Sequence, residues 1–303
     1  MPSGDYMMNN GAGKNAVSYV DDDFDPSSWK EVEAYTEELL NRKISCSKCL
    51  EGIIRDASEL SEHISEKGAL LYIGMTCDTE NEEKKGAFLD FVENVRPKLS
   101  EFSDSLNRRI VGHEAIEDLP ERYDLMIRSM KNDVEIFRKE NIPLSVEQTK
   151  LVTEAQTING AMSVEYEGEE YTIPEMRVFL ESNERSVREG AWKAVADRRL
   201  EDEERLSEIF DQLIVIRNEM AINAGFETYT DYMFRAMERF DYTKDDCLEF
   251  HDAIEAVCVP LMREINSRRI KSLSLGSLRP WDVNEKTGVG LSLIHISEPT
   301  RRT

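Results

Sequence analysis

The sequence predicts a mainly α-helical protein with one small β-hairpin. Through most of the chain, apolar residues recur at intervals of three and four, the spacing of one buried helix face. Several segments open with Ser or Thr followed three residues later by Asp, Glu or Gln, a pattern typical of helix N-termini. Only 15 Gly and 9 Pro occur among 303 residues, which indicates long regular elements with few turns.

The charge and composition of the chain exclude several classes of function. The 38 basic and 61 acidic residues give a formal net charge of −23. Nucleic-acid binding needs clustered Lys and Arg, and an anionic membrane surface would repel this chain. No apolar run is long enough to span a membrane, and the polar N-terminus lacks the apolar core of a secretory signal. The five cysteines are too few for a disulfide framework, so we expect a cytoplasmic protein with free thiols.

The first part of the chain is predicted to be a helical region that follows a disordered lead. Residues 1–25 are polar and acidic, so we expect no fixed structure there. Order is expected to begin at Ser28, which opens a capping box ending at Glu31. A second helix is predicted over about 45–66. Three further helices with short connections are predicted around Phe88–Val95, Leu99–Ile110 and Tyr123–Phe137.

The middle of the chain contains the predicted hairpin. Ser145 begins another capping box, which predicts a helix from there to about Ile158. The segment Ser163–Thr172 then alternates and turns around Gly168, so we expect a β-hairpin within about 162–173.

The longest helix is predicted from about Asn183 to Ala224, followed by a glycine cap at Gly225. On its solvent side, Glu184 with Arg188 and Glu201 with Arg205 are expected to form i,i+4 ion pairs. Capping boxes that begin at Thr228 and Thr243 predict two more helices, the last of which runs to about Lys271.

The last residues differ from the rest of the chain. Residues 292–303 have no helical period, and their two Arg and single Glu reverse the acidic trend. They resemble the translated sequencing-adapter tail found at the ends of some metagenomic gene fragments, so we exclude them from fold reasoning. The natural sequence is therefore expected to be cut off near Leu291.

The four histidines form no recognisable metal site. His113 and Glu114 begin a segment that differs from the zinc-protease pattern H-E-x-x-H because Glu117 stands where the second His is needed. Gly112 and Pro120 flank it, which predicts a short turn and a surface His. His251 is similarly expected on a helix surface, His63 in solvent, and His295 in the excluded tail.

The cysteines and glycines likewise suggest no chemistry. Cys46 and Cys49 form a C-x-x-C, but Cys77 alone cannot supply the second pair of a zinc site. A redox role is not favoured because the surroundings are helical, so both cysteines are predicted to be semi-buried residues inside a helix. No nucleotide-binding glycine motif and no G-x-S-x-G motif is present. From the residues alone, no catalytic, cofactor-binding or metal-binding residue can be assigned.

A family resemblance adds what these motifs do not provide. From Asn141 to Asp282 the chain resembles the oligoendopeptidase F and thimet-oligopeptidase class of zinc metallopeptidases. The resemblance is carried by residues 140–173, by the long helical segment 181–237, and by residues 258–282, which end in Leu278-Arg279-Pro280-Trp281-Asp282. Within the long segment the matching residues are Arg185, Arg188, Ala191, Arg217, Ala221, Gly225, Phe226 and Tyr229. Trp29–Pro97 matches more loosely.

The resemblance implies a cytoplasmic zinc peptidase that cleaves short peptides between two largely helical lobes. Residues 26–182 would form the N-terminal lobe, and residues 183–291 would begin the catalytic lobe. The zinc-binding H-E-x-x-H of the family would lie after this point, so the parent protein is expected to bind zinc, whereas this chain alone is expected to bind none and to be inactive. The alternative is a non-enzymatic helical scaffold whose acidic surface contacts basic partners.

Overall fold

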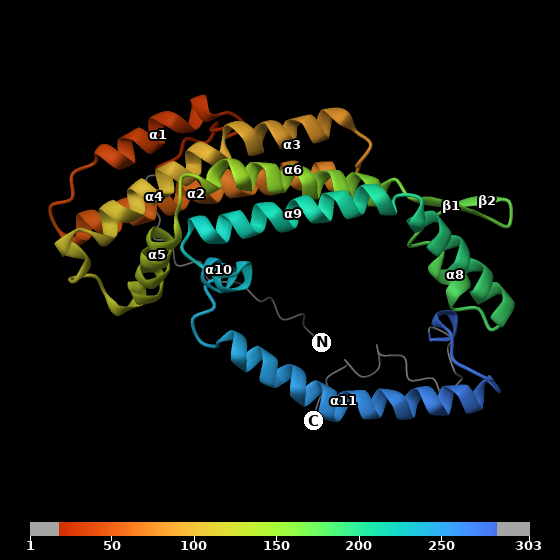
Figure 1. The fold of residues 1–303 in the computed structure, drawn as a ribbon. Helices are drawn as coiled ribbons and strands as arrows, with labels where there is room; N and C mark the ends of the chain where they lie inside the picture. Colours follow the sequence, from red (N-terminus) through yellow and green to blue (C-terminus); the bar gives the residue numbers. More distant parts are fainter. Residues whose placement is uncertain (1–17, 284–303) are drawn as a thin grey trace, which may run out of the picture. The chain divides into compact units, whose positions relative to one another are not determined.

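The computed structural model describes residues 18–283 of the chain (Figure 1). The chain divides between Ile142 and Pro143 into two compact units. The mainly helical fold with one small hairpin is confirmed. The lobe boundary at 182–183 stays a prediction, and the excluded tail at 292–303 lies outside the described residues.

The first unit is a bundle of helices around one hydrophobic core. Its helices are α1 (Trp29–Asn41), α2 (Ser47–Thr76), α3 (Glu82–Asn94), α4 (Arg96–Val111) and α5 (Asp124–Ile136). Two short 3₁₀ helices, Glu114–Ile116 and Glu121–Tyr123, connect α4 to α5. The core is built from the apolar faces that the helical spacing predicts. Its most deeply buried members include Val32, Leu39, Leu50, Ile53, Leu60, Ile64, Phe91, Val95 and Ile110.

Helix α2 continues ten residues beyond its predicted end, to Thr76. Its interior contains Gly68, and glycine in a helix costs about 1 kcal/mol relative to alanine. Here the glycine is needed because a Cβ would lie 3.0 Å from Cε1 of Phe91 in α3. The close approach of α3 therefore explains a residue that weakens the local helical signal.

The chain is already ordered at Ser18, which corrects the prediction of a disordered lead as far as residue 25. Val20 is buried in the core of the first unit. The Glu59 carboxylate on α2 accepts hydrogen bonds from the backbone N–H groups of Tyr19 (2.9 Å) and Val20 (3.1 Å). An acidic residue on a distant helix thus provides the partner that composition alone cannot indicate.

Arg109 fixes the end of α1 against α4. Its guanidinium donates hydrogen bonds to the carbonyl oxygens of Leu39, at 2.9 Å, and of Arg42. These carbonyls have no partner within their own helix, and a cation is favourable at the negative end of the helix dipole. One side chain on α4 therefore satisfies the backbone of a helix about seventy residues earlier.

The second unit contains the hairpin and the remaining helices. Its helices are α6 (Asn141–Gly160, which starts at the boundary), α7 (Arg177–Leu180), α8 (Arg185–Leu200), α9 (Glu203–Asn223), α10 (Tyr229–Ala236) and α11 (Lys244–Ser272), followed by a 3₁₀ turn, η3 (Pro280–Asp282). Among residues 18–283, no helix is both long enough and apolar enough to cross a membrane.

Helix α6 begins at Asn141, four residues before the predicted capping box at Ser145. Pro143 is tolerated because it lies in the first turn, where backbone N–H groups have no intrahelical acceptor. Leu151 of α6 packs against Ile209 and Leu213 of α9, and the two helices lie side by side (Figure 1).

Two polar contacts set the direction of this helix pair. Arg205 Nε donates to Glu154 Oε1 at 2.7 Å, and Arg217 Nε donates to Gln148 Oε1 at 3.2 Å. Residue numbers fall along α6 as they rise along α9, so the two helices are antiparallel. Arg205 also pairs with Glu208 at 3.0 Å, which corrects the predicted Glu201–Arg205 pair.

The predicted single helix from Asn183 to Ala224 is wrong, because α8 and α9 are separate helices. They break at Glu201 and Asp202, where Arg198 pairs with Asp202 at 2.6 Å. The sequence contains the signal for this break. Arg198 and Arg199 end one helix and Glu203 and Glu204 begin the next, which is the charge order that helix dipoles favour.

The hairpin has the predicted position. Strands β1 (Ser163–Tyr166) and β2 (Glu169–Thr172) pair antiparallel with Ser163 opposite Thr172. Glu167 and Gly168 both have positive φ, 54° and 86°, as a two-residue type I′ turn requires. Val164 packs with Met176, Ala191 and Val195, which anchors the hairpin to α8.

The caps that the sequence predicts after α9 are present. Gly225 has φ +86°, and the N–H of Phe226 donates to the carbonyl of Ala221 at 2.9 Å, the six-residue bond of a Schellman cap. The side chain of Thr228 caps α10. Thr243 and Asp246 form a complete capping box at the start of α11.

Helix α11 has an apolar face that is exposed in the structure. Phe250, Ile254, Val257, Leu261 and Ile265 follow helical spacing, and Val257 is 68% and Leu261 55% exposed. An exposed stripe of this length is characteristic of surfaces that bind another protein surface or promote association. No residue of α11 is buried, so the stripe does not contribute to a hydrophobic core within the described residues.

We expect the 303-residue chain to self-associate through this stripe. A Val257→Gln, Leu261→Gln double variant should weaken association by about tenfold or more, because burying each residue contributes roughly 1.5–3 kcal/mol. Size-exclusion chromatography with light scattering, together with binding of a hydrophobic dye, measures the effect. Glu255→Gln on the same helix is the matched control. A wild-type chain that stays monomeric at high concentration and binds no dye would contradict this expectation.

Candidate functional site

Within residues 18–283, the histidines take part in no group of three or more possible metal ligands. His113 is the N-cap of the first 3₁₀ helix, and its Nδ1 accepts the N–H of Ala115 at 3.1 Å, so the predicted turn is confirmed. His251 is exposed on α11, as predicted. His63 is half-buried, with its ring 6.2 Å from that of Phe24, which corrects its prediction as a solvated residue. His295 lies outside the described residues.

The C-x-x-C agrees with its prediction only in part. Cys49 lies in the first turn of α2 and is half-buried, as predicted, whereas Cys46 is not inside the helix but is its exposed N-cap. The Sγ of Cys46 accepts the N–H of Cys49 at 3.3 Å. The two cysteines are therefore at the positive end of a helix, and they are not spacers in a core.

A buried cluster of charges joins the start of α8 to η3. Asp282 is fully buried, and its carboxylate accepts hydrogen bonds from both Nε and Nη2 of Arg185, each at 2.9 Å. Arg188, which is 2% exposed, adds a contact from Nη2 to Oδ1 at 3.2 Å. The backbone N–H of Arg279 donates to Oδ2 at 2.9 Å. Four donors thus fill the acceptor sites of one carboxylate.

Arg188 has the larger share of backbone contacts in this cluster. Its Nε donates to the carbonyl of Trp281 at 3.0 Å, and its Nη1 donates to those of Ser182 (2.8 Å) and Asn183 (3.2 Å). The prediction of a solvent-exposed Glu184–Arg188 pair is therefore wrong. A buried guanidinium needs full hydrogen bonding, and residues more than ninety positions later provide part of it.

Two tryptophans pack beside the cluster. The rings of Trp192 on α8 and Trp281 lie 5.5 Å apart. Lys193 Nζ is 5.8 Å from the centre of the Trp281 ring, within range of a cation–π contact. These contacts help to hold η3 on α8 next to the buried Asp282 and Arg188, whereas the Arg185 side chain is 41% exposed.

The electrostatics of Asp282 follow from these contacts. The hydrogen bonds from Arg185 lower the pKa of Asp282 below its usual value, and the Arg279 N–H and Arg188 act in the same direction, against the effect of burial. Asp282 is therefore an ion across the neutral range, and it is fixed as an acceptor. A carboxylate held in this way is suited to positioning the chain and has no proton to donate.

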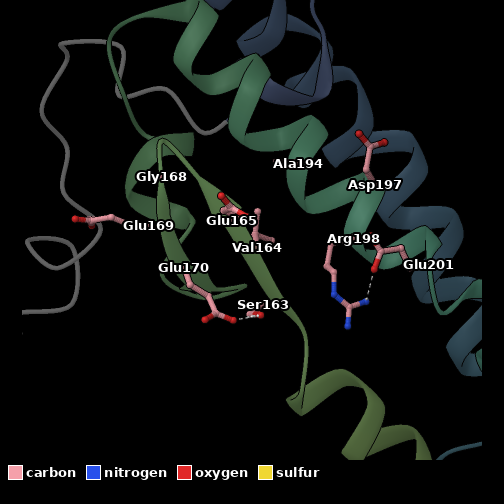
Figure 2. Close-up of a pocket in the computed structure, with 10 residues that line it drawn as sticks. All are labelled: Ser163, Val164, Glu165, Gly168, Glu169, Glu170, Ala194, Asp197, Arg198 and Glu201. Carbon is pink, nitrogen blue, oxygen red and sulfur yellow. Dashed lines mark hydrogen bonds and ion pairs between the residues drawn. The ribbon is translucent and has the colours of Figure 1, made fainter.

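A shallow groove lies beside the hairpin, between β1–β2 and α8 (Figure 2). Its volume is about 740 Å³. Ser163 donates to Glu170 at 2.6 Å across the hairpin, and Arg198 pairs with Glu201 at 3.6 Å on the helix. The lining carries one cation and five carboxylates, those of Glu165, Glu169, Glu170, Asp197 and Glu201. A groove of this charge attracts cationic groups and repels anionic ones.

Neither feature was assigned as a site from the sequence. The acidic residues at 201–204 have the composition of a solvated helix face, so the groove gives no distinctive signal. For the buried cluster, the available signal was the resemblance itself, which includes Arg185, Arg188 and Asp282 among its matching positions. Burial and long-range pairing of these residues are properties of the folded chain.

The described residues do not fit a zinc ion. Within residues 18–283, no three or more His, Cys, Asp or Glu side chains converge as possible metal ligands. A zinc site uses three or four such ligands. No catalytic step that depends on zinc is therefore derived from these residues.

Two family profiles match the chain in order. The Peptidase M3 N-terminal domain matches residues 21–137, and Peptidase family M3 matches residues 178–292. The chain belongs to peptidase family M3. The second match includes α8 and the 278–282 segment, so the Arg185–Arg188–Asp282 cluster lies within the part that matches the M3 peptidase profile. The resemblance to the oligoendopeptidase F class is confirmed.

Solved structures of M3 peptidases have the same fold. A protein of Bacillus anthracis str. Ames assigned as an oligoendopeptidase F is similar at a TM-score of 0.81 and 21% identity, over 89% of this chain and 50% of that one. PZ peptidase A with an inhibitor is similar at 0.81 and 22% identity, over 86% and 46%. Oligoendopeptidase F from Enterococcus faecium is similar at 0.69 and 14%, over 87% and 56%. No curated protein matches by sequence. The chain spans about half the length of these solved relatives.

We expect the Asp282→Asn variant to lose about 3–5 kcal/mol of unfolding free energy, because it leaves the buried Arg188 without its anion. Denaturant unfolding followed by circular dichroism measures the loss. Asp252→Asn on the exposed side of α11 is the control and should change stability by less than about 0.5 kcal/mol. If the two variants unfold at the same denaturant concentration, the cluster does not stabilise the second unit.

The same pair of proteins should differ in pH dependence. The pKa of Asp282 is lower in the folded than in the unfolded chain. Its contribution is therefore fully present above the unfolded value of about 4 and is lost as the pH falls through the lower, folded value. The stability gap between wild type and Asp282→Asn should be constant from pH 5 to 8, on the order of the same 3–5 kcal/mol, and should shrink below pH 4. A gap that grows on acidification would contradict this sign.

Proposed function

We propose that the parent protein is a zinc-dependent peptidase that hydrolyses short peptides. The observation that carries the proposal is that both M3 profiles match this chain in the family's order, at residues 21–137 and 178–292. The fold supports it, because a solved structure assigned as an oligoendopeptidase F shares it at a TM-score of 0.81. Zinc and the length of the substrates rest on the family resemblance.

In this proposal, the described residues act as a frame for the reaction. They do not form a zinc site, so the metal ligands and the groups that activate water belong to residues outside 18–283. The Arg185–Arg188–Asp282 cluster is a positioning element, because it fixes η3 against α8. The 303-residue chain alone would then neither retain zinc nor cleave peptides.

We further propose a cytoplasmic location with peptides as partners. All five cysteines are free, which suits a reducing compartment. The net charge of −23 disfavours both nucleic acid and anionic membrane surfaces as partners. The acidic groove at the hairpin would favour substrates without clustered acidic side chains.

Metal content and peptide cleavage test the proposed function. A version of the parent protein with the length of its solved relatives should contain about one zinc per chain and cleave a quenched fluorescent peptide. Its activity should fall to background with a chelator and return when zinc is added. The 303-residue chain, measured in parallel by metal analysis and the same assay, should show neither property.

Two outcomes would overturn the proposal. A full-length parent with no bound metal and no cleavage would favour the helical scaffold instead. Stoichiometric zinc with chelator-sensitive cleavage in the 303-residue chain would place the metal site within it, and would return attention to His113 and Glu117. Asp252→Asn, an exposed substitution on α11, should leave metal content and cleavage unchanged in either protein.

A further inference from the structure

The most reactive group that the proposed function leaves unused is the cysteine pair at the start of α2. The Sγ atoms of Cys46 and Cys49 lie 2.8 Å apart. Cys46 is exposed and Cys49 is half-buried, so both can meet small molecules from solvent. We propose that Cys46 and Cys49 are a redox-active dithiol that closes to an intramolecular disulfide by exchange with a small disulfide such as oxidised glutathione.

The geometry favours a thiolate on Cys49. Cys46 can donate its S–H to Cys49, and Ser45 Oγ lies 3.2 Å from the same sulfur. The hydrogen bond with Cys46 has the largest effect, and together these contacts lower the pKa of Cys49 to about 7. Both residues lie at the N-terminus of a 30-residue helix, where the dipole stabilises negative charge. A thiolate formed at near-neutral pH is the nucleophile for exchange.

The local charge also suits an anionic oxidant. Lys43 precedes Cys46 by three residues and Lys48 lies between the two cysteines in the sequence, whereas Glu51 follows Cys49 by two. Glu51 is paired with Arg122 at 2.8 Å, and Arg42 is occupied by Glu38 and Asp56. The two lysines near the thiols in the chain would attract a negatively charged small disulfide. Cys77 is the C-cap at the other end of the same 30-residue helix, so it stands apart from the pair.

The exchange is balanced in two steps. The Cys49 thiolate attacks one sulfur of the small disulfide, which forms a mixed disulfide and releases one small thiolate. Cys46 then loses its proton and attacks Cys49 Sγ, which breaks the mixed bond and releases the second small thiolate. Two protein thiols are oxidised, one small disulfide is reduced, and the protons end on the two small thiols.

The first test measures the product. The 303-residue chain is equilibrated in glutathione buffers of increasing oxidised fraction, quenched by alkylation and analysed by peptide mass spectrometry. The peptide that contains both cysteines should convert to the internally bonded form, which is two hydrogens lighter and carries no alkyl group. Cys46→Ser keeps a residue that can cap the helix but removes the resolving thiol, so Cys49 should remain as the glutathione adduct.

The second test measures reactivity. At pH 7 Cys49 should react with iodoacetamide several-fold faster than Cys77 in the same chain, and its rate should be half-maximal near pH 7. Cys46→Ala, which removes the side-chain donor, should shift that midpoint upward, whereas Cys77→Ser should leave it unchanged. Equal alkylation of Cys49 and Cys77, or no internal disulfide at any glutathione ratio, would overturn the proposal. Both tests use thiol chemistry alone, so their result is independent of whether the parent is a peptidase.

Discussion

The pairing of Asp282 with Arg185 and Arg188 joins parts of the second unit that are more than ninety residues apart in the chain. Its energetic basis is the high cost of removing charges from water, which is recovered only when every donor and acceptor has a partner. Asp282 meets this condition with two guanidinium groups and one backbone N–H. The position of η3 on α8 and the packing of Trp281 on Trp192 depend on this cluster.

The first unit depends on a different balance. Its main core is the apolar cluster that includes Leu50, Ile53 and Ile110, and polar groups around it satisfy backbone groups of the segments that enter it. Arg109 does so for α1, and Glu59 does so for the segment that enters the bundle at Tyr19. Hydrophobic burial supplies most of the stability of such a bundle, whereas these hydrogen bonds determine where its helices start and stop.

Charge has two roles in this member of the M3 family. Most of the acidic residues lie on exposed helix faces, where individual ion pairs contribute little to stability. At the hairpin groove they gather around one arginine and define the sign of a surface. Near Cys46 and Cys49 the sequence carries two lysines, Lys43 and Lys48, beside one acidic residue, Glu51, so the local charge there differs from that of the groove.

The sequence by itself determined the fold class, the hairpin with its turn at Gly168, the glycine cap at Gly225, the Thr228 cap of α10 and the capping box of α11, because these follow from the spacing and chemistry of neighbouring residues. Part of the break between α8 and α9 was also readable, from Arg198 followed by Glu203. The family was accessible through the order of its segments.

The tertiary structure alone decided which charged residues are buried and which cysteines meet. The residues next to Arg188 in the sequence do not distinguish it from an arginine on a helix surface. Its burial depends on Asp282, a partner too distant in the chain for local periodicity to reveal. The capping role of Cys46 depends on where α2 starts, which is set by the packing of Leu50 and Ile53 in the core. Local patterns fix elements, whereas desolvation and long-range contacts fix the sites, because a charge or thiol acquires its chemistry from the groups that the fold brings within hydrogen-bonding distance.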